Sequence, residues 1–545
     1  MLRIAIAQLN FKIGDFEANT SKIADVLFTA KNQGVDLVVF PEMSVSGYMP
    51  DDLLDYPSFV EKSEYSLELV AQSCQGIAAI VGGVMRNSGK GRLLQNVCCF
   101  MQNGRIETVI PKTLLPTYDV FSESRYFEPA TEQQVISFKG INIGIAICED
   151  LWDLYNNFEY TKSPGEVLKN LGADLIINPS ASPFHLGKDS HRNRVFSGQV
   201  NRFNLPVLYV NQVGVHTELI FDGSSRAVNN NGEVAIQLPD FESCIRTVEF
   251  GENGFIPGDG AVSLDTDPLP QLYKGLVFGI RDYFEKMGFK KAVIGASGGI
   301  DSALVQTLAV HALGAENVLA VMMPSRYSSE GSVSDAKKLS DNLGNSCIEL
   351  PIQDIHHAYE NTLEPYFKDL PEGLAEENLQ ARSRAVLLMG LSNKLGYILL
   401  NTSNKSEMAV GYSTLYGDLC GSLSVIGDVY KTQVYALANY INRNEEIIPF
   451  NIIEKEPSAE LRPEQKDSDS LPPYPILDGI LRMYIEEFKG ADEIVIEGYD
   501  MHTVQRVLQL VNNSEYKRYQ APPILRVSAK AFGKGRIMPL VAKYP

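Results

Sequence analysis

The chain has 545 residues, more than one hydrophobic core usually supports, so we expect two or more domains. Its 44% of hydrophobic residues suffices for buried cores, and a formal net charge of −19 argues against nucleic-acid or anionic-membrane partners. Seven cysteines without Cys-x-x-Cys spacing indicate free thiols in a reducing compartment. The longest apolar stretch, 76–85, is too short to span a bilayer, so we expect a cytoplasmic protein with no membrane partner.

The first 250 residues alternate between strand-like and helix-like patterns. Apolar runs predict strands at 2–9, 35–40, 77–84, 97–101, 141–147, 175–178 and 207–210, with helices at 19–33, 58–73 and 188–203. Asn-Gly pairs at 103–104 and 231–232 indicate hairpin turns. These elements predict a mixed α/β domain over 1–250, with helices covering its sheets.

A stretch rich in glycine, proline and aspartate, 251–270, is typical of a linker. After it, helices at 271–287, 300–313 and 332–343 alternate with strands at 291–295 and 318–323. This repeat predicts a doubly wound parallel sheet for the second domain, 271–545. Proline-rich, charged residues at 454–475 indicate a mobile loop within it.

A glycine turn stands between the strand 291–295 and the helix 300–313. It reads Gly295, Ala296, Ser297, Gly298, Gly299, Ile300, Asp301 and Ser302. The glycines let a phosphate approach the backbone, and the first N–H groups of the helix point at it. Ser297 and Ser302 add hydroxyl donors, and Asp301 offers a hard oxygen ligand for Mg²⁺. No lysine follows the glycines, so the loop is not of the Walker type that transfers a γ-phosphate. It resembles the loop of ATP pyrophosphatases, which hold the β,γ-pyrophosphate of ATP as a leaving group while an acid is adenylated.

Three ionisable residues of the first domain stand where apolar strands end. Cys148 follows the strand 141–147, Glu42 follows 35–40, and Lys112 follows Val109-Ile110-Pro111. A lone cysteine there would more often be a buried core thiol. Together the three resemble the Glu-Lys-Cys triad of the nitrilase superfamily, in that superfamily's chain order.

The triad's chemistry needs these residue types. Lys112 favours the Cys148 thiolate against the acidic Glu149 and Asp150, and it stabilises an oxyanion together with a backbone N–H. A helix N-terminus after Asp150 would help. Glu42 takes the thiol proton and later activates water. Glu123 is open to two readings: the superfamily's accessory glutamate, or a surface charge.

A nitrilase-like domain followed by an ATP pyrophosphatase domain is similar to the glutamine-dependent NAD synthetases along nearly the whole chain. The stretches that carry this resemblance are 111–118, 125–127, 148–152, 377–382, 401–407 and 517–523. The resemblance implies an N-terminal αββα nitrilase-like sandwich and a C-terminal doubly wound, adenine nucleotide α-hydrolase-like domain. It also implies hydrolysis of glutamine, amidation of deamido-NAD to NAD with ATP and Mg²⁺, and an enclosed ammonia tunnel. Ammonia would serve as an alternative nitrogen source, and the chain would form at least a dimer through its synthetase domains.

The same resemblance assigns site residues. For glutamine they are Tyr118, Ser182 and Lys188. For ATP they are the loop 295–302 with Thr402, Arg384, Lys431 and Ser458. For deamido-NAD they are Asn378, Arg382, Glu407, Tyr412, Ser413, Thr414, Leu415 and Lys517, and Asp301 and Glu407 would share the metal. Arg382 and Arg384 point to nearly opposite sides of one helix, so periodicity supports only one of them. Ammonia-using relatives carry a Gly-Thr-Asp-His type of segment where this chain has 401–404, so the polar contacts around Thr402 do not transfer.

Two alternatives stay open from the residues alone. One is another glutamine-fed ATP pyrophosphatase, such as GMP or asparagine synthetase. The Gly-x-Cys-x-Gly signature of the GMP enzymes is missing, and transfer-RNA thiolases would want a basic surface. The other is a binding protein whose motifs are relics, which the intact ionisable residues of the triad and Asp301 oppose.

Overall fold

The computed structural model describes residues 1–154, 160–256, 267–368 and 370–542. Its chain divides into two compact units, Met1–Thr266 and Asp267–Pro545. Part of the expected linker 251–270 belongs to regular structure: strand β15 (Gly254–Ile256) pairs in a sheet, and helix α5 (Pro268–Met287) begins before residue 271. Residues 257–266 lie outside the described part. The expected boundaries at 250 and 271 therefore remain predictions.

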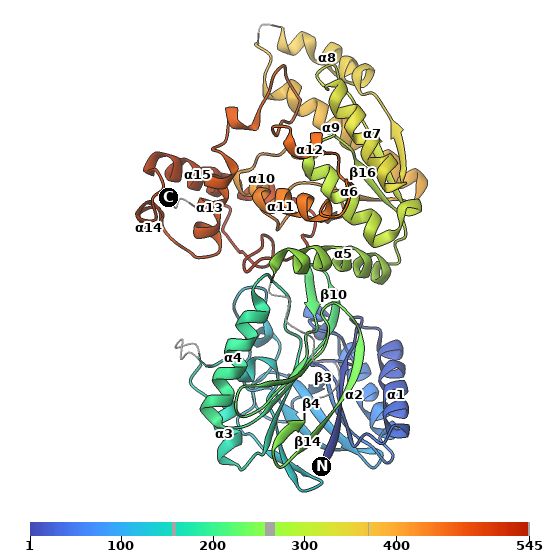
Figure 1. Ribbon diagram of the computed structural model, residues 1–545, viewed down its shortest axis with the longest axis vertical. Coiled ribbons are helices and arrows are strands. Elements are labelled where there is room, and N and C mark those ends of the chain that lie inside the picture. Colours follow the sequence, from blue (N-terminus) through green and yellow to red (C-terminus); the bar gives the residue numbers. More distant parts are fainter. Residues whose placement is uncertain (155–159, 257–266, 369, 543–545) are drawn as a thin grey trace. The chain divides into compact units, whose positions relative to one another are not determined.

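Unit 1 contains two large sheets and a short ribbon (Figure 1). The first sheet has the order β15-β14-β1-β2-β3-β4-β5, with β14 (Cys244–Gly251), β1 (Leu2–Gln8), β2 (Leu37–Val39), β3 (Ala78–Arg86), β4 (Leu94–Gln102) and β5 (Arg105–Pro111). The second has the order β13-β12-β9-β8-β7-β6, with β13 (Val234–Gln237), β12 (Arg226–Val228), β9 (Val207–Asn211), β8 (Leu175–Ser180), β7 (Ile141–Ile145) and β6 (Val135–Phe138). The ribbon pairs β10 (Val213–His216) with β11 (Leu219–Asp222). Both Asn-Gly turns join antiparallel neighbours, β4 with β5 and β12 with β13, so the two hairpin predictions are confirmed.

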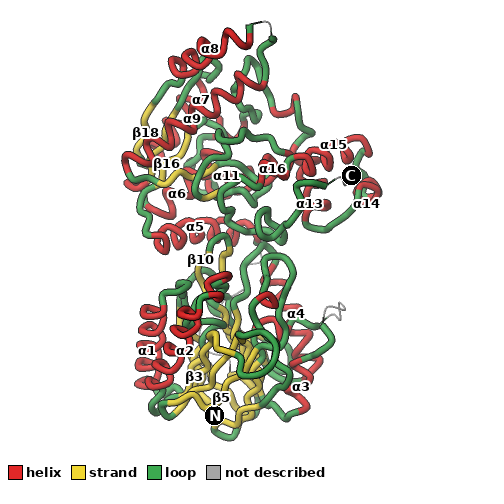
Figure 2. Tube along the Cα trace, turned by 180° about the vertical axis from the view of Figure 1, so that it is seen from behind, coloured by secondary structure: helices red, strands yellow, loops and turns green. Residues whose placement is uncertain are grey.

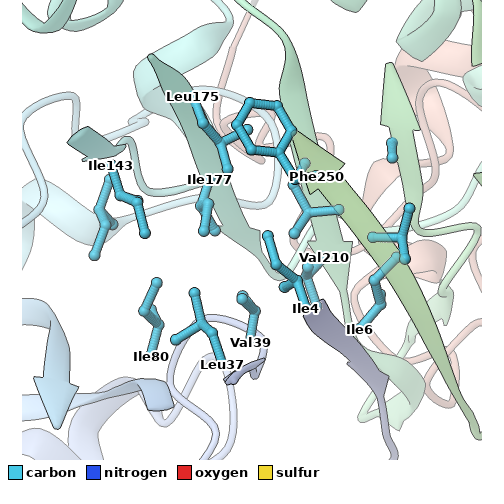
Figure 3. Packing of buried hydrophobic residues seen from close by; sticks show 14 of the residues in the cluster. Ile4, Ile6, Leu37, Val39, Ile80, Ile143, Leu175, Ile177, Val210 and Phe250 are labelled. Atoms are coloured by element: carbon cyan, nitrogen blue, oxygen red, sulfur yellow. The ribbon is translucent and has the colours of Figure 1, made fainter. Parts of the chain in front are cut away.

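The two sheets bury one face each against the other. Side chains alternate along a strand, so in β1 Ile4 and Ile6 enter the core between the sheets while Ala5 and Ala7 face the helices. Leu175 and Ile177 of β8 do the same from the second sheet, and Figure 3 shows them facing Leu37 and Val39. Because both faces are covered, these strands read as continuous apolar runs, which is why the sequence pattern locates them.

Helices cover the outer face of each sheet. Helices α1 (Phe16–Asn32) and α2 (Pro57–Ser73) pack on the first sheet, and α3 (Pro164–Asn170) and α4 (Lys188–Phe203) on the second. Figure 2 shows the strands between these two helix pairs. The expected αββα sandwich is confirmed.

Unit 2 is built on a parallel sheet in the order β18-β17-β16-β19-β20. Its strands are β16 (Ala292–Gly295), β17 (Val318–Met322), β18 (Ser346–Glu349), β19 (Ile398–Asn401) and β20 (Leu423–Ser424). The chain leaves the central β16 toward β17 and β18, then returns to its other side with β19. Ligands of open α/β sheets bind at such a switch point, beyond the carboxyl ends of the strands.

Helices lie on both faces of this sheet, as a doubly wound fold requires. Helix α9 (Leu374–Leu395) packs Leu388 on one face, while α6 (Ile300–Leu313) and α7 (Glu330–Leu343) cover the other. The remaining helices are α8 (Gln353–Phe367), α10 (Lys405–Val410), α11 (Lys431–Ile441), α12 (Phe450–Glu454), α13 (Tyr474–Ile485), α14 (Ala491–Ile496), α15 (Met501–Asn513) and α16 (Glu515–Arg518). Helices α10 and α13 to α15 share a core of their own. Within the described residues, no helix has both the length and the apolarity to cross a bilayer.

The inter-sheet core of unit 1 generates a first prediction. Replacing the fully buried Ile177 by alanine should lower the free energy of unfolding of this unit by about 2–5 kcal/mol, because it leaves a cavity between two sheets. Urea denaturation followed by the fluorescence of Trp152, the single tryptophan of the chain, reports on unit 1. The matched control is Ile245→Ala on β14, where the side chain is 36% exposed. Equal losses in the two variants would show that this core is not close-packed.

Candidate active sites

The buried ammonium of Lys112 lies between two carboxylates. Lys112 follows β5 and donates to Glu42 Oε1 and to Glu123 Oε1, both at 2.7 Å. All three side chains are fully buried. Glu42 follows β2 in the first sheet, and its Oε2 accepts the N–H of Ala181, which follows β8 in the second sheet at 3.0 Å. The site therefore ties the ends of both sheets together.

Two neutral residues complete this cluster. Asn96 on β4 donates to Glu42 Oε1 at 2.7 Å and to Glu123 Oε2 at 3.3 Å, and the Tyr48 hydroxyl donates to Glu123 Oε1 at 2.8 Å. Glu123 is thus part of the buried site, and its reading as a surface charge is wrong. Each glutamate has a fixed orientation because several donors hold it.

Cys148 faces this cluster from a strained turn. Its φ is +42°, a left-handed conformation that a non-glycine residue adopts only when its surroundings enforce it. Asp150 provides that enforcement, since Oδ2 accepts the N–H of Ile147 at 2.9 Å. Its Oδ1 accepts the N–H groups of Thr113 and Leu114 at 3.1 and 2.7 Å. One carboxylate thus joins the cysteine turn to the segment that carries Lys112.

The electrostatics of the free site favour a neutral thiol. Burial, and then the charge of Glu42, raise the pKa of Cys148 well above its usual value, although Lys112 opposes them. Burial alone would lower the pKa of Lys112, but Glu123 and Glu42 outweigh it and raise that pKa. The charge of Lys112 thus acts toward the thiolate, in the expected direction, but burial and the carboxylates of Glu42, Glu149 and Glu123 act against it. No helix begins after Asp150 in the described residues of this turn; a short 3₁₀ helix (Cys148–Leu151) begins at the cysteine itself.

Glu149, the residue after Cys148, interacts with two tyrosines and with the charge of Lys188. The Tyr118 hydroxyl donates to both oxygens of Glu149 at 3.0 Å, and Tyr160 donates to Oε1 at 2.8 Å. Burial raises the pKa of Glu149 to about 7, with these hydroxyls and lysines 112 and 188 opposing it. The Lys188 ammonium lies 4.0 Å from the centre of the Trp152 ring. Tyr118 therefore contacts Glu149 directly, and the charge of Lys188 acts on the same carboxylate.

Ser182 lies next to the residue whose N–H binds Glu42. Its own N–H donates to Asn211 Oδ1 at 2.9 Å, and its carbonyl accepts from Arg192 at 3.1 Å. Arg192 is in turn held by both oxygens of Asp222, at 2.6 and 2.8 Å. The structure thus fixes the backbone of Ser182 through a buried ion pair.

The second candidate site is a cavity of unit 2 beyond the ends of β16, β17 and β19. Seven of the eight loop residues 295–302 line it, Gly298 being the exception, with Thr402, Arg384, Glu407, Tyr412, Lys431 and Ser458. Gly298 has φ +74°, and a Cβ there would lie 2.3 Å from the carbonyl oxygen of Ser332, so only glycine fits. The Ser297 and Ser302 hydroxyls lie 3.0 Å apart, which orders the loop.

The two carboxylates expected at a metal share a cation in this cavity. Lys431 Nζ lies 2.5 Å from Asp301 Oδ2 and 3.2 Å from Glu407 Oε1. Asn404 caps α10: its side chain donates to Asp301 Oδ1 at 2.9 Å and accepts the N–H of Glu407 at 2.9 Å. Burial, and then the charge of Asp301, raise the pKa of Glu407 to about 8. Two carboxylate oxygens around one cation form a donor set that suits Mg²⁺.

Several of the expected deamido-NAD residues form a second group around 411–415, while Glu407 and Tyr412 line the cavity itself. Asn378 accepts from the Thr414 hydroxyl at 2.7 Å, and Arg382 donates to the Leu415 carbonyl at 3.2 Å. Lys517 donates to the carbonyls of Gly411 and Ser413, both at 2.7 Å. Arg384, in contrast, donates to the carbonyl of Met323 at 3.0 Å and lines the cavity. The two arginines of α9 therefore belong to different groups, as their spacing predicts.

Sequence reasoning missed the residues that orient the others. Asn96 and Tyr48 carry no motif, and Asp150 and Asn404 stand within quoted stretches without a role of their own. Only the capping pattern Asn404-x-x-Glu407 gave a local signal for one of them.

Comparisons with known proteins agree with this division. The carbon-nitrogen hydrolase family matches residues 3–252, and the NAD synthase family matches 272–521. Glutamine-dependent NAD(+) synthetases of Synechocystis sp. and Thermotoga maritima are 44% and 41% identical, each over 100% of this chain and 99% of the relative. The solved glutamine-dependent NAD+ synthetase of Acinetobacter baumannii is 38% identical with a TM-score of 0.79, covering 99% of this chain and 98% of that one.

Fold and sites thus define a two-part enzyme, a carbon–nitrogen hydrolase unit followed by an NAD synthase unit. The full-length similarity shows more: the chain belongs to the glutamine-dependent NAD(+) synthetase family, the carbon–nitrogen ligases that draw their nitrogen from glutamine.

The role of Asp150 generates a second prediction. Asp150→Asn leaves one acceptor oxygen for three backbone N–H groups, so unit 1 should lose about 1–3 kcal/mol of stability. Displacing the cysteine turn should slow glutamate release by up to about a hundredfold. The matched control is Asp174→Asn, which removes an exposed carboxylate bound to the N–H of Asn142 at the start of β7. Unchanged hydrolysis in Asp150→Asn would show that the turn keeps its shape without this carboxylate.

Proposed function

We propose that Glu42, Lys112 and Cys148 hydrolyse glutamine in unit 1 and that the cavity of unit 2 uses ATP to amidate deamido-NAD to NAD. The observation that carries this proposal is the pairing of a buried Glu-Lys-Glu cluster beside a strained cysteine with a phosphate-type loop at a topological switch point. From the family similarity we also expect a cytoplasmic protein that assembles at least as a dimer through its synthetase units.

In the first reaction the thiol of Cys148 gives its proton to Glu42 as the sulfur attacks the side-chain amide carbon of glutamine. The raised thiol pKa requires such a base at the moment of attack. Lys112 stabilises the developing oxyanion. Glu42 then returns the proton to the departing nitrogen, ammonia leaves, and a glutamyl thioester remains. Glu42 next activates the water that cleaves this thioester to glutamate.

Recognition of glutamine requires one cation and one anion, because the free amino acid carries both charges. Lys188 suits its α-carboxylate and Glu149 its α-ammonium group, and the two already interact across the site. Tyr118 and Tyr160 hold Glu149 in place. Ser182, fixed by Asn211 and Arg192, lines the same region next to the Glu42 contact.

In the second reaction the loop 295–302 with Thr402, Arg384, Lys431 and Ser458 binds ATP. Asn378, Arg382, Glu407, the segment 412–415 and Lys517 bind deamido-NAD. The nicotinate carboxylate attacks the α-phosphorus, pyrophosphate leaves, and ammonia then displaces AMP to give NAD. Asp301 and Glu407 would hold Mg²⁺, which neutralises the leaving pyrophosphate when bound. No group of three His, Cys, Asp or Glu within the described residues forms a metal cage, and Mg²⁺ held by two carboxylates and substrate phosphates needs none.

A third prediction tests the first reaction. Cys148→Ala removes the proposed nucleophile, so glutamine-dependent NAD formation should fall by about four orders of magnitude or more. Excess ammonium should still support synthesis, because unit 2 is unchanged. Product analysis with ATP, Mg²⁺, deamido-NAD and either nitrogen source checks both statements. Cys99→Ala, on the helix-facing side of β4, is the control thiol. Surviving glutaminase in Cys148→Ala would assign the chemistry to another residue.

A fourth prediction tests the second reaction. Asp301→Asn keeps the shape of the side chain but removes the charge that faces Lys431 and that would hold Mg²⁺. Synthesis should therefore collapse with glutamine and with ammonium alike, while the thioester at Cys148 still forms. Asp341→Asn, on the exposed side of α7, is the control for charge removal in the same unit. Near-normal synthesis from ammonium would place the metal elsewhere, and formation of ADP and phosphate would overturn the reaction type.

A further inference from the structure

The cavity of unit 2 carries more negative than positive charge before any substrate enters. Its described lining includes six carboxylates, Asp301, Glu407, Asp418, Glu456, Glu460 and Asp467, and three cations, Arg384, Lys431 and Lys455. The triphosphate of ATP adds further negative charge. Binding of ATP therefore needs cationic groups that can turn toward its phosphates.

Two of the three cations are already engaged deep in the wall. Arg384 donates to a carbonyl, and the ammonium of Lys431 lies between Asp301 and Glu407 with 2% of its side chain exposed. Lys455, directly after α12, has 34% of its side chain exposed. Its ammonium contacts the Ser332 hydroxyl and lies 2.7 Å from Glu460 Oε1. Lys455 is thus the cation of this wall with most freedom to turn.

Glu460 lies in a set of donors that suits a phosphate. Besides Lys455, its Oε1 accepts from the hydroxyls of Ser332 and Ser329 at 2.7 and 3.1 Å, and its Oε2 accepts the N–H of Ser329 at 3.4 Å. Burial alone would raise the pKa of Glu460, but Lys455 and Ser332 outweigh it and lower that pKa, so the carboxylate is ionised at neutral pH.

This carboxylate is also beside the phosphate-type loop. The backbone of Ser332 approaches Gly298 so closely that no Cβ fits between them, while the Ser332 hydroxyl binds Glu460 and Lys455. Ser332 thus lies against the loop 295–302 with its backbone and binds the Lys455–Glu460 pair with its side chain. An anion held by the loop therefore lies close to this pair.

We propose that Lys455 is a phosphate-binding residue for the β,γ end of ATP and that Glu460 is its internal counter-ion, which the polyphosphate displaces. This inference rests on the proposed function, in that the loop 295–302 binds ATP. Before ATP arrives, Glu460 neutralises Lys455 and occupies the donors. When ATP binds, Lys455 and the two serine hydroxyls exchange one anion for another, so these donors face the polyphosphate instead of Glu460.

Opposite effects of two substitutions test this exchange. Lys455→Met should weaken binding of inorganic pyrophosphate by about tenfold or more, because it removes a charge-assisted hydrogen bond. Glu460→Gln should tighten pyrophosphate binding by about threefold or more, because it removes the competing charge. Calorimetry on the full chain with Mg²⁺ measures both, and the KM for ATP in ammonium-driven synthesis should move in the same directions. Glutamate release measured without ATP and deamido-NAD tests that unit 1 stays intact in both variants.

The matched control is Glu456→Gln. Glu456 lies on the same loop and the same wall, but its carboxylate pairs with Lys466. If Glu456→Gln tightens binding as much as Glu460→Gln, the effect is one of net charge, and the exchange is refuted. Weaker binding in Glu460→Gln would show that this carboxylate only holds the loop, which also refutes it. Lys455→Gln is a second variant in case the Met variant misfolds. If its thermal unfolding is unaltered, its pyrophosphate binding should be weakened as well. If the unsubstituted chain binds neither ATP nor pyrophosphate, the proposed function itself fails.

Discussion

The buried ammonium of Lys112 is the interaction on which unit 1 depends. This ammonium lies 2.7 Å from each of two buried carboxylates, and the Asn96 amide and the Ala181 N–H also donate to Glu42, so each buried group has partners. Any one of these charges alone would be very unfavourable there. The cluster therefore forces the ends of both sheets, β4 and the cysteine turn into a single geometry, so the same contacts that fix the fold also orient the reacting groups.

Unit 2 uses the same arrangement in an open form. Lys431 also lies between two carboxylates, but these retain 18% and 15% exposure toward a cavity. A fully buried cluster of charged side chains can only position other groups. A cluster in a cavity wall can exchange one of its partners for a metal or a phosphate. The chemistry agrees with this difference: a proton moves between fixed groups in the first unit, and a large anion enters and leaves the second.

The strands, and the site residues that follow them closely, could be predicted from the sequence. Lys112 directly follows β5, Glu42 and Cys148 come shortly after β2 and β7, and the loop 295–302 begins at the end of β16. The pattern that locates each strand therefore also places these residues at the sheet ends. Glu123, Asn96 and Asp150 lie 11, 54 and 36 residues from the partners they bind. Such pairings depend on the register of strands and on loop paths, which no local pattern contains. For the same reason the raised pKa of the Cys148 thiol could not be predicted, because burial is its largest cause.

The two units also differ in the contacts that fix the backbone of the Cys148 turn and of the loop 295–302. Cys148 keeps a left-handed φ because the carboxylate of Asp150 binds the backbone of its turn. This unit is therefore organised before glutamine arrives. The loop 295–302 is ordered by its own serines and by glycine at 298, while its neighbouring charges are paired with one another. Organising the second site therefore requires its substrate. Free ammonia is protonated in water and is then no longer a nucleophile. An enzyme of this kind therefore wastes less glutamine when ammonia is released only while an adenylated acceptor is present. A second site that is completed by its ligands provides a physical signal for that state.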